Sequence, residues 1–345
     1  MIDWISVVIP LRHTPIESGS IMSVLPDGSV EWSAPKRHQV EGSYSSKFTI
    51  KSQGTKDESG RAEEIFIDGN PSKFLQGHNV FGGCDLKGLL LGVFRFLYTQ
   101  ELVEFDIIDA VASIDAGHIK RIDITDSIEF QNKVQVRSYI KQLSQTSHTR
   151  TGRPMQKNWT LMYNTGAKRW TLKVYSKGDE IRKKTLSEAH PDREFLVNEA
   201  NRLCRVELQI RSLELKRIGL DRVYNHTYEK ILETYQRYVG LIKMSTKIQL
   251  TSNELQTLSR VHRQTYFAWK EGIDVAGEMT RPTFYRHRAA INDLGVDISI
   301  PYTPTTADVI PLKTVVQGQP YQIPEEAHER GLIYKSEPFK LKIVN

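Results

Sequence analysis

The chain has few of the residues that cross-link or anchor proteins. Its 345 residues include only two cysteines, Cys84 and Cys204, which excludes a disulfide framework and a cysteine-based zinc site. The most apolar run, residues 89–98, is interrupted by Arg95 and is far shorter than the roughly 20 residues of a membrane span. Residues 1–4 lack the basic stretch of a signal peptide, so we expect a protein of a reducing cytoplasm with no membrane anchor.

Two short motifs are also missing. None of the ten histidines has another histidine two positions away, which excludes a metal site built on a His-hydrophobic-His pair. No Gly-x-x-x-x-Gly-Lys-Ser/Thr phosphate loop occurs, so the chain carries no nucleotide-driven motor of that class. Positive charge is in modest excess, with a formal net charge of +6 and a pI near 9.1, which suits a polyanionic partner without proving one.

The pattern of the chain predicts an α+β fold, with a largely antiparallel central sheet and flanking helices. Strand and helix segments mix without a regular βαβ rhythm, and the 39% hydrophobic content is enough for a core. We predict three parts: a large domain over residues 1–240, a helical region over 241–300 and a tail over 301–345. Residues 339–344 of the tail alternate and can return as an edge strand. Strands are predicted over 1–10, 64–68, 119–125, 159–163, 170–177 and 205–212, and helices from about 85 and over 128–144.

Three of these strands share one polar face. Side chains alternate across a strand, so each strand separates into an apolar and a polar set. If the three strands lie in one sheet, two carboxylates, a tyrosine and a lysine converge, and Glu180 lies just beyond a strand end. The converging residues are Asp123, Glu207, Tyr175 and Lys177.

This set of residues suits phosphodiester chemistry. Carboxylates can hold a hard divalent cation such as Mg²⁺ or Mn²⁺, which polarises a phosphate. The hydroxyl of Tyr175 can then attack in line, helped by positive charge from the cation and Lys177 because a phenol titrates near 10. A second interpretation stays open. Charged residues line any half-exposed sheet, and Asp123 and Glu207 would then be ion-pair partners of arginines such as Arg121 and Arg205.

Two segments are candidates for DNA contact. Residues 141–159 contain no acidic residue and are predicted to be a flexible basic loop for phosphates and an unstacked base, although Trp159 can equally be a core residue. Residues 252–294 predict three short helices, of which the last resembles a helix-turn-helix recognition helix or an ordinary basic amphipathic helix. The side chains expected to contact DNA are Arg121, Arg150, Arg153, Lys157, Trp159, Asn79, Arg281, Tyr285, Arg286 and Arg288.

The same residues carry a resemblance to the replication initiators of filamentous bacteriophages, the gene II endonuclease family, and more distantly to rolling-circle plasmid initiators. Residues 75–82, Leu-Gln-Gly-His-Asn-Val-Phe-Gly, resemble the hallmark loop of that family. Residues 121–123 match its Arg-Ile-Asp strand, and residues 205–207 match its Arg-aromatic-Glu strand with Val206 in the aromatic position. Residues 171–177 are similar to the segment whose tyrosine attacks DNA, and residues 337–343 are similar to the family's C-terminus.

The resemblance implies roles for individual residues. Tyr175 corresponds to the nucleophile, and Asp123, Glu180 and Glu207 correspond to its acidic partners. Without a His-hydrophobic-His pair, the Mg²⁺ or Mn²⁺ site would be carboxylate-based or would include His78 as a single histidine ligand. Alternatively, His78 and Asn79 hydrogen-bond to backbone or to a DNA phosphate.

The expected protein is therefore a metal-dependent endonuclease that nicks and closes one DNA strand through a covalent 5′-phosphotyrosine and so initiates rolling-circle replication. Its expected partners are single-stranded and supercoiled origin DNA, a host helicase and the host replication machinery, with possible oligomers at the origin. One rival is a DNA-binding replication or transcription regulator of the same fold without chemistry. Another is a conjugative relaxase or transposase that uses the same tyrosine step.

Overall fold

The structure is a computed structural model that describes residues 1–16, 19–149, 152–183, 186–244, 249–299, 302 and 318–335. It confirms the α+β expectation, with a ten-stranded sheet whose paired strands are all antiparallel. The sheet order is β4-β5-β6-β1-β7-β12-β11-β10-β9, and β14 pairs with β7. The strands are β1 (Ile2–His13), β4 (His38–Glu41), β5 (Lys47–Lys56), β6 (Ala62–Gly69), β7 (His118–Glu129), β9 (Met155–Lys157), β10 (Thr160–Tyr163), β11 (Trp170–Ser176), β12 (Leu203–Arg211) and β14 (Gln319–Pro320).

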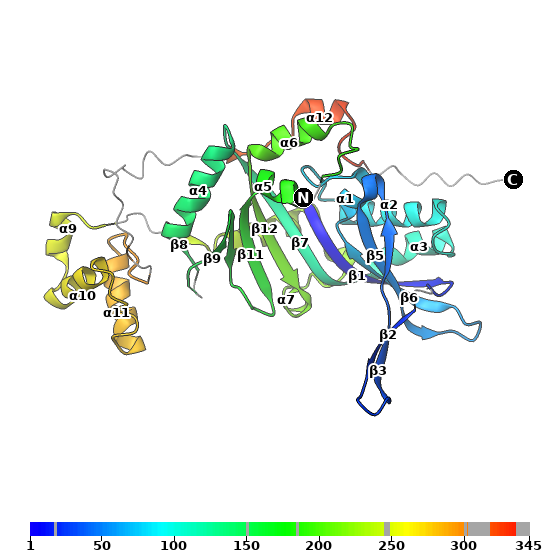
Figure 1. The fold of residues 1–345 in the computed structure, drawn as a ribbon, viewed down its shortest axis with the longest axis horizontal. Helices are drawn as coiled ribbons and strands as arrows, with labels where there is room; N and C mark the ends of the chain where they lie inside the picture. Colours follow the sequence, from blue (N-terminus) through cyan, green and yellow to red (C-terminus); the bar gives the residue numbers. More distant parts are fainter. Residues whose placement is uncertain are drawn as a thin grey trace.

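Two small strand pairs lie outside this sheet. Strands β2 (Ser20–Val24) and β3 (Val30–Pro35) form a hairpin that projects from the body, and β8 (Ser147–His148) pairs with β13 (Lys243–Met244) (Figure 1). The helices are α1 (Pro71–Gln76), α2 (Leu86–Thr99), α3 (Ile107–Ser113), α4 (Lys133–Thr146), α5 (Lys177–Lys183), α6 (Arg193–Asn201), α7 (Ser212–Ile218), α8 (Tyr228–Val239), α9 (Ser252–Thr257), α10 (Arg260–Lys270), α11 (Arg281–Asn292) and α12 (Glu325–Glu329).

One face of the sheet is apolar and covered by helices. Side chains of β1, β5, β6 and β7 pack with α2, α3 and α8, and side chains of β10, β11 and β12 pack with α4. Figure 1 shows α2 and α3 beside one end of the sheet and α4 beside the other. The apolar residues Leu172, Val174, Val206 and Leu208 all lie in these two clusters, as strand alternation predicts. The polar residues between them must therefore point to the opposite face, where α5 and the 75–82 loop lie.

Several predicted boundaries were wrong. The helix predicted from residue 128 begins at Lys133, because β7 continues to Glu129 and the Asn132 side chain caps the helix by accepting from the N–H groups of Val134 and Gln135. The prediction of a flexible basic loop over 141–159 is wrong for residues 141–148 and 155–157, since residues 141–146 complete α4 and residues 147–148 and 155–157 are strands. Lys177, predicted as the last residue of a strand, is the first residue of α5.

The helical region has a core of its own. Helices α9, α10 and α11 pack around Tyr266, Trp269 and Ile291, which confirms the prediction of three short helices. It lies to one side of the sheet, while residues 318–335 return to the sheet through β14 and α12 (Figure 1). The division at residue 240 stays a prediction, and the predicted strand over 339–344 lies outside the described residues. Within the described part of the chain, no helix has the length and apolar character that a membrane crossing requires.

Candidate active site

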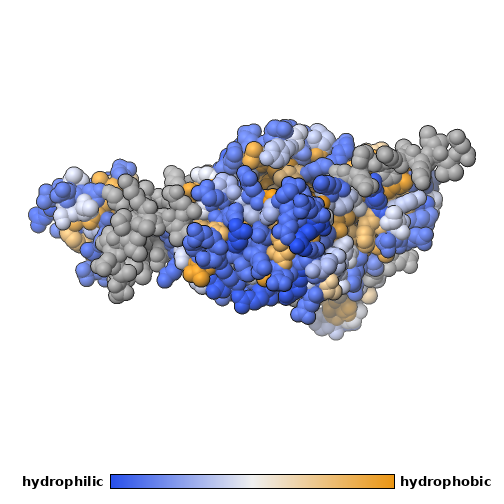
Figure 2. Space-filling view, turned by 90° about the horizontal axis from the view of Figure 1, so that it is seen from above, coloured by the Kyte–Doolittle hydropathy of each residue, from blue (hydrophilic) through white to orange (hydrophobic). Residues whose placement is uncertain are grey.

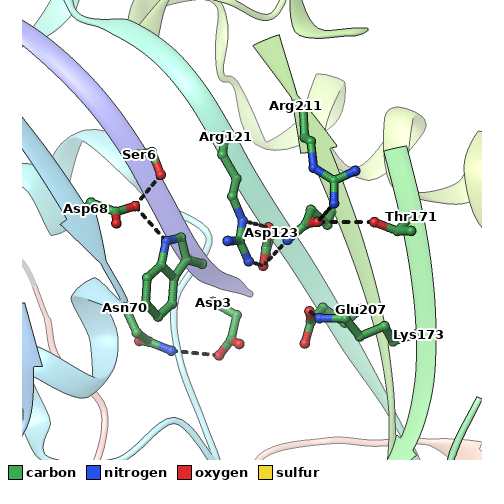
Figure 3. Close-up of polar contacts among 12 residues, drawn as sticks. Asp3, Ser6, Asp68, Asn70, Arg121, Asp123, Thr171, Lys173, Glu207 and Arg211 are labelled. Atoms are coloured by element: carbon green, nitrogen blue, oxygen red, sulfur yellow. Dashed lines mark hydrogen bonds and ion pairs between the residues drawn. The ribbon is translucent and has the colours of Figure 1, made fainter. Parts of the chain in front are cut away.

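The polar face of β7, β11 and β12 lines a cleft of about 460 Å³. Cross-strand pairing places Lys173 opposite Glu207 and Gln209 opposite Asp123, so that these side chains stand on one face (Figure 3). Residues of β1, β9, β10, α1 and α5 complete the walls of this cleft. The alternation argument therefore holds for Tyr175, Asp123 and Glu207, which all line it.

Tyr175 lies near the end of β11 with its hydroxyl in the cleft. The hydroxyl donates to Glu207 Oε2 at 3.2 Å, and Glu207 Oε1 accepts from Lys173 Nζ at 2.5 Å. Tyr175 is only 6% exposed. Burial raises the pKa of Tyr175 well above its usual range, and the negative charges of Glu207 and Asp3 add to the rise. At neutral pH the residue is therefore a neutral phenol that already donates to a carboxylate.

Asp123 is buried more deeply, at 2% exposure. The Nε and Nη2 atoms of Arg121 donate to its two oxygens at 2.8 and 2.5 Å, and Gln209 Nε2 donates at 3.4 Å. The Arg121 guanidinium in turn lies 5.2 Å from the centre of the Trp4 ring. Burial raises the pKa of Asp123 to about 6 and the charge of Glu207 adds to this, while Arg121 opposes it. Arg121, expected to contact DNA, is thus first of all the partner of Asp123.

Lys177 is fully buried, and its partners in the described chain do not include the tyrosine hydroxyl. Its amino group donates to Asn79 Oδ1 and Glu180 Oε2, both at 2.7 Å. Burial lowers the pKa of Lys177, although the neighbouring Glu180 opposes the change. Arg205, rather than Lys177, is the cation whose charge most lowers the pKa of Tyr175. Lys177 therefore ties α5 to the 75–82 loop, and Glu180 is held by it at the cleft wall.

Arg205 of β12 also holds the 75–82 loop. It is 1% exposed, and its Nη1 and Nη2 atoms donate to the backbone carbonyls of Asn79 and Val80 at 2.5 and 2.6 Å. Its Nε donates to Ser127 at 3.3 Å. The predicted ion pair between Arg205 and Glu207 is not the one formed, because Glu207 pairs with Lys173 on the neighbouring strand. Two buried cations therefore fix the 75–82 loop against the sheet.

Asp3 is a cleft residue that the sequence did not reveal. Its Oδ1 accepts from Asn70 Nδ2 at 2.9 Å and from Asn79 Nδ2 at 2.8 Å. Strand β1 has one residue more than β7 at this point, since Ile2 pairs with Ile124 and Trp4 with Asp123. Asp3 is the extra residue of this β-bulge, and bulges re-aim side chains. Alternation fails here, so both Asp3 and its neighbour Trp4 line the cleft.

The expected cation site is not preassembled. Carboxylate oxygens are suitable donors for Mg²⁺ or Mn²⁺, yet the three predicted acidic ligands are each paired with a basic side chain. The pairs are Asp123 with Arg121, Glu207 with Lys173 and Glu180 with Lys177. Across the part of the chain that the structure describes, no group of three or more His, Cys, Asp or Glu side chains is placed to hold a metal ion.

Comparison with known proteins identifies the family. Residues 1–231 match the family model for the N-terminal part of the phage gene II replication-associated protein, and residues 250–333 match the model for its C-terminal part. The chain belongs to the gene II replication-associated protein family. The replication-associated protein of Enterobacteria phage I2-2 is 35% identical over 332 residues, covering 94% of this chain and 96% of the relative. The resemblance to filamentous phage replication initiators is confirmed.

More distant relatives match in part. The replication-associated protein of Enterobacteria phage fd is 32% identical over 123 residues, or 34% of this chain and 28% of the relative. That of Salmonella phage IKe is 26% identical over 186 residues, or 52% and 42%. A solved rolling circle replication initiator protein from Geobacillus stearothermophilus aligns with 73% of this chain and 89% of its own, at 15% identity and a TM-score of 0.33.

In this member of the gene II family, unpaired lysines surround the mouth of the cleft. Lys73 of α1, Lys157 of β9 and Lys183 of α5 line it, and none forms an ion pair within the described ranges. Trp159 stands beside them, half-buried, with the Arg137 guanidinium 4.9 Å from its ring centre. Seen from the side of α5 and α6, the surface over the body is mainly hydrophilic (Figure 2). Lys73 was not predicted, because its isolated position in the sequence carries no basic pattern.

His78 lies behind the cleft rather than in it. The side chain is fully buried, with its ring 5.7 Å from that of Phe81 and 5.6 Å from that of His190. Burial lowers the pKa of His78 to about 3, and the charges of His190 and Lys177 contribute. The ring is thus neutral and out of reach of a bound phosphate. Asn79, the next residue, reaches the cleft instead.

The DNA-contact candidates outside the cleft have different surroundings. On α11, Arg281, Tyr285 and Arg286 are exposed, in agreement with a DNA-contacting face. Arg288 is not available in the same way, because it makes two hydrogen bonds of 2.7 and 2.6 Å to the buried carboxylate of Asp297. Arg153 is partly buried, and burial lowers its pKa. Arg150 lies outside the described residues.

Proposed function

We propose that this gene II family member is a site-specific endonuclease and strand-transfer enzyme that initiates rolling-circle replication. Tyr175 attacks a phosphodiester of the origin, remains joined to the 5′ phosphate and leaves a free 3′ hydroxyl. The observation that carries the proposal is the hydrogen bond of 3.2 Å from the Tyr175 hydroxyl to Glu207, inside a cleft whose mouth bears unpaired lysines. Family membership supports a role in replication.

The contacts of Tyr175 suggest how it is activated. A neutral phenol is a weak nucleophile, so its proton must leave as the oxygen attacks phosphorus. Glu207 already accepts from this hydroxyl and is in position to take the proton. Lys173, 2.5 Å from the other oxygen of Glu207, holds the carboxylate in place. The new ester preserves the energy of the phosphodiester bond, so the same residues can reverse the step and close the strand.

The mouth of the cleft supports binding of a single strand. Lys73, Lys157 and Lys183 come from three separate elements and can neutralise successive phosphates. Trp159 offers a ring on which a base next to the nick can stack. We propose that Arg281, Tyr285 and Arg286 contact the origin duplex from the exposed face of α11. A host helicase, assembly of several copies at the origin and action in the host cytoplasm complete the proposal.

The proposal includes a dependence on Mg²⁺ or Mn²⁺. Its basis is the hard oxygen donors of Asp123, Glu180 and Glu207, which would first have to exchange their basic partners for the ion. Asp123 can change partner at modest cost only if Arg121 turns to another anion, such as a DNA phosphate. Nicking in the presence of each cation and of a chelator tests this dependence directly.

A nicking assay tests the function. Wild-type protein and Mg²⁺ should convert supercoiled origin plasmid to a nicked form with protein on the 5′ end, whereas Tyr175→Phe should lower the rate more than about 10³-fold. Tyr163→Phe is the matched control, because Tyr163 is a buried tyrosine of the neighbouring strand whose hydroxyl lies 2.7 Å from Ser147 Oγ, outside the cleft. This control should nick normally.

Two outcomes would overturn the assignment. A protein-capped 5′ end made by Tyr175→Phe would show that another residue is the nucleophile. Binding of origin DNA by both proteins without nicking by either, under any cation, would favour the rival function of a DNA-binding regulator.

A further inference from the structure

The proposed transesterification moves two protons, but the contacts of Tyr175 account for one. In an in-line displacement the attacking and leaving oxygens lie on opposite sides of the phosphorus atom. Glu207 serves the tyrosine oxygen. The 3′ oxygen of the DNA leaves as a poor alkoxide unless it receives a proton, and on closure its hydroxyl must lose one. A second acid-base group is therefore expected on the other side of the cleft.

Asp3 occupies that side. Strand β1, which carries Asp3, and strand β12, which carries Glu207, flank β7 on its two edges. Their backbones are thus separated by two strand spacings, or about 10 Å, which leaves room for a phosphate between the two carboxylates. Figure 3 shows Asp3 and Glu207 on either side of the β7 residue Asp123. The charge of Asp3 nevertheless acts on Tyr175, so the two residues share one site.

A β-bulge in β1 places Asp3 on this side of the cleft. Ile2 and Ile5 are three positions apart and would lie on opposite faces of a regular strand, but the bulge in β1 keeps both in the core and turns Asp3 toward the cleft. Two asparagine side chains then fix the carboxylate, Asn70 at the start of α1 and Asn79 in the 75–82 loop. Asn79 is itself held by the fully buried Lys177. The 75–82 loop thus contributes to the orientation of this carboxylate through Asn79.

The partners of Asp3 also distinguish it from the other acids of the cleft. Asp123, Glu180 and Glu207 are each bound by a lysine or an arginine. Asp3 forms no ion pair with any described residue, and its hydrogen bonds come from neutral amides and go to one oxygen, Oδ1. Its second oxygen, Oδ2, accepts no hydrogen bond within the described chain. A carboxylate with one oxygen anchored and the other open is suited to exchange a proton with a substrate.

We propose that Asp3 is the catalytic acid-base residue for the 3′ oxygen of the DNA, an inference that rests on the proposed function. On closure, Asp3 takes the proton of the 3′ hydroxyl as the bond from O3′ to phosphorus forms. The bond from phosphorus to Tyr175 breaks, and Glu207 returns its proton to the tyrosine oxygen. Cleavage is the same sequence in reverse, with protonated Asp3 giving its proton to the leaving 3′ oxygen and Glu207 taking that of Tyr175.

A substrate with sulfur in place of the scissile 3′ oxygen tests this role. A thiolate leaves without a proton, so loss of the acid should not slow its departure. With an ordinary oligonucleotide of the origin, Asp3→Asn should cleave about 10²–10⁴-fold more slowly than wild type. With the 3′-thio oligonucleotide the two proteins should differ less than about tenfold. The Asn side chain can still accept from Asn70 and Asn79 through its Oδ1, so the fold should be retained, which thermal unfolding checks.

The same substrate makes the closing step accessible. Covalent complex formed from the 3′-thio oligonucleotide can be given a strand with an ordinary 3′ hydroxyl, and Asp3→Asn should join it about 10²–10⁴-fold more slowly than wild type. Asp68→Asn is the matched control, since Asp68 of β6 accepts from Trp4 Nε1 at 3.0 Å and from Ser6 but does not line the cleft. It should behave as wild type on both substrates.

The outcomes are separable. Equal slowing of both substrates by Asp3→Asn would mean that Asp3 only shapes the site, and no slowing of either would mean that it has no part in the reaction; each result overturns the proposal. Cleavage of the 3′-thio substrate by Tyr175→Phe would instead overturn the nucleophile assignment on which the proposal rests.

Discussion

The cleft and helix α11 both gather charged side chains, but they use them differently. In the cleft every lining carboxylate except Asp3 pairs with a cation of the described chain, as the buried Asp123 does with Arg121. On α11, Arg281 and Arg286 are exposed and take part in no ion pair with any residue that the structure describes. Buried ion pairs hold the side chains of a site in fixed positions, whereas exposed unpaired arginines are free to bind a phosphate or a base edge. Arg288 is the exception on α11, and it belongs with the buried pairs.

The largest expected effect is on the free energy of unfolding, and it distinguishes the paired from the unpaired arginines of α11. Arg288→Ala should lower the free energy of unfolding of the helical region by about 3–5 kcal/mol, because it leaves the buried carboxylate of Asp297 without its main cation. Arg286→Ala, two positions earlier and exposed, should change the same quantity by less than about 0.5 kcal/mol. Urea unfolding followed by fluorescence of the buried Trp269 measures both. Equal effects of the two substitutions would show that Arg288 is also a surface residue.

A smaller effect separates the affinity for origin duplex from the rate of strand cleavage. The double variant Arg281→Ala/Arg286→Ala should bind origin duplex about ten- to hundredfold more weakly, by about 1–3 kcal/mol, because base and phosphate contacts are lost. Cleavage of a saturating short single strand in the cleft should stay within about twofold. Lys216→Ala/Lys230→Ala removes two exposed charges, one from α7 and one from α8, and serves as the control in a binding titration at fixed salt. Loss of single-strand cleavage in the double arginine variant would contradict the division of labour.

The sequence predicted the cleft better than it predicted α11, and the reason is geometric. A strand has only two faces, so an apolar pattern at Leu172 and Val174 settles where Tyr175 points. A helix has a continuous surface, so periodicity does not show which of its arginines are paired. The partner of Arg288 is Asp297, nine positions later, and no periodic pattern predicts this contact. The family resemblance supplied the roles in the cleft and the pattern of a recognition helix supplied those on α11, but neither could say which charges are paired.

Strand alternation could not predict the positions of two cleft residues. Asp3 lies on a bulge, and a single extra residue in β1 leaves no mark in a pattern that is otherwise regular. Lys177 was given a strand position because the polar alternation runs through it, yet the chain turns into α5 after Ser176. Its amino group therefore reaches Asn79 and Glu180 rather than the tyrosine hydroxyl.

The smallest expected effect concerns His78, the buried neutral group behind the cleft. Its pKa of about 3 in the fold is below the ordinary 6.5, so the unfolded chain binds more protons between these values. The stability that neutral His78 contributes is therefore complete above pH 6.5 and is lost as the pH falls toward 3, by up to about 1.4 kcal/mol per pH unit. His78→Gln should flatten the decline of unfolding free energy between pH 6.5 and 5 by about that slope. The slope, rather than the absolute stability, is the measurement, because the substitution also disturbs packing against Phe81. If Mn²⁺ raised the melting temperature of the wild type but not of His78→Gln, His78 would be a metal ligand. The buried ion pairs of the cleft would then be only one of the arrangements that the site adopts.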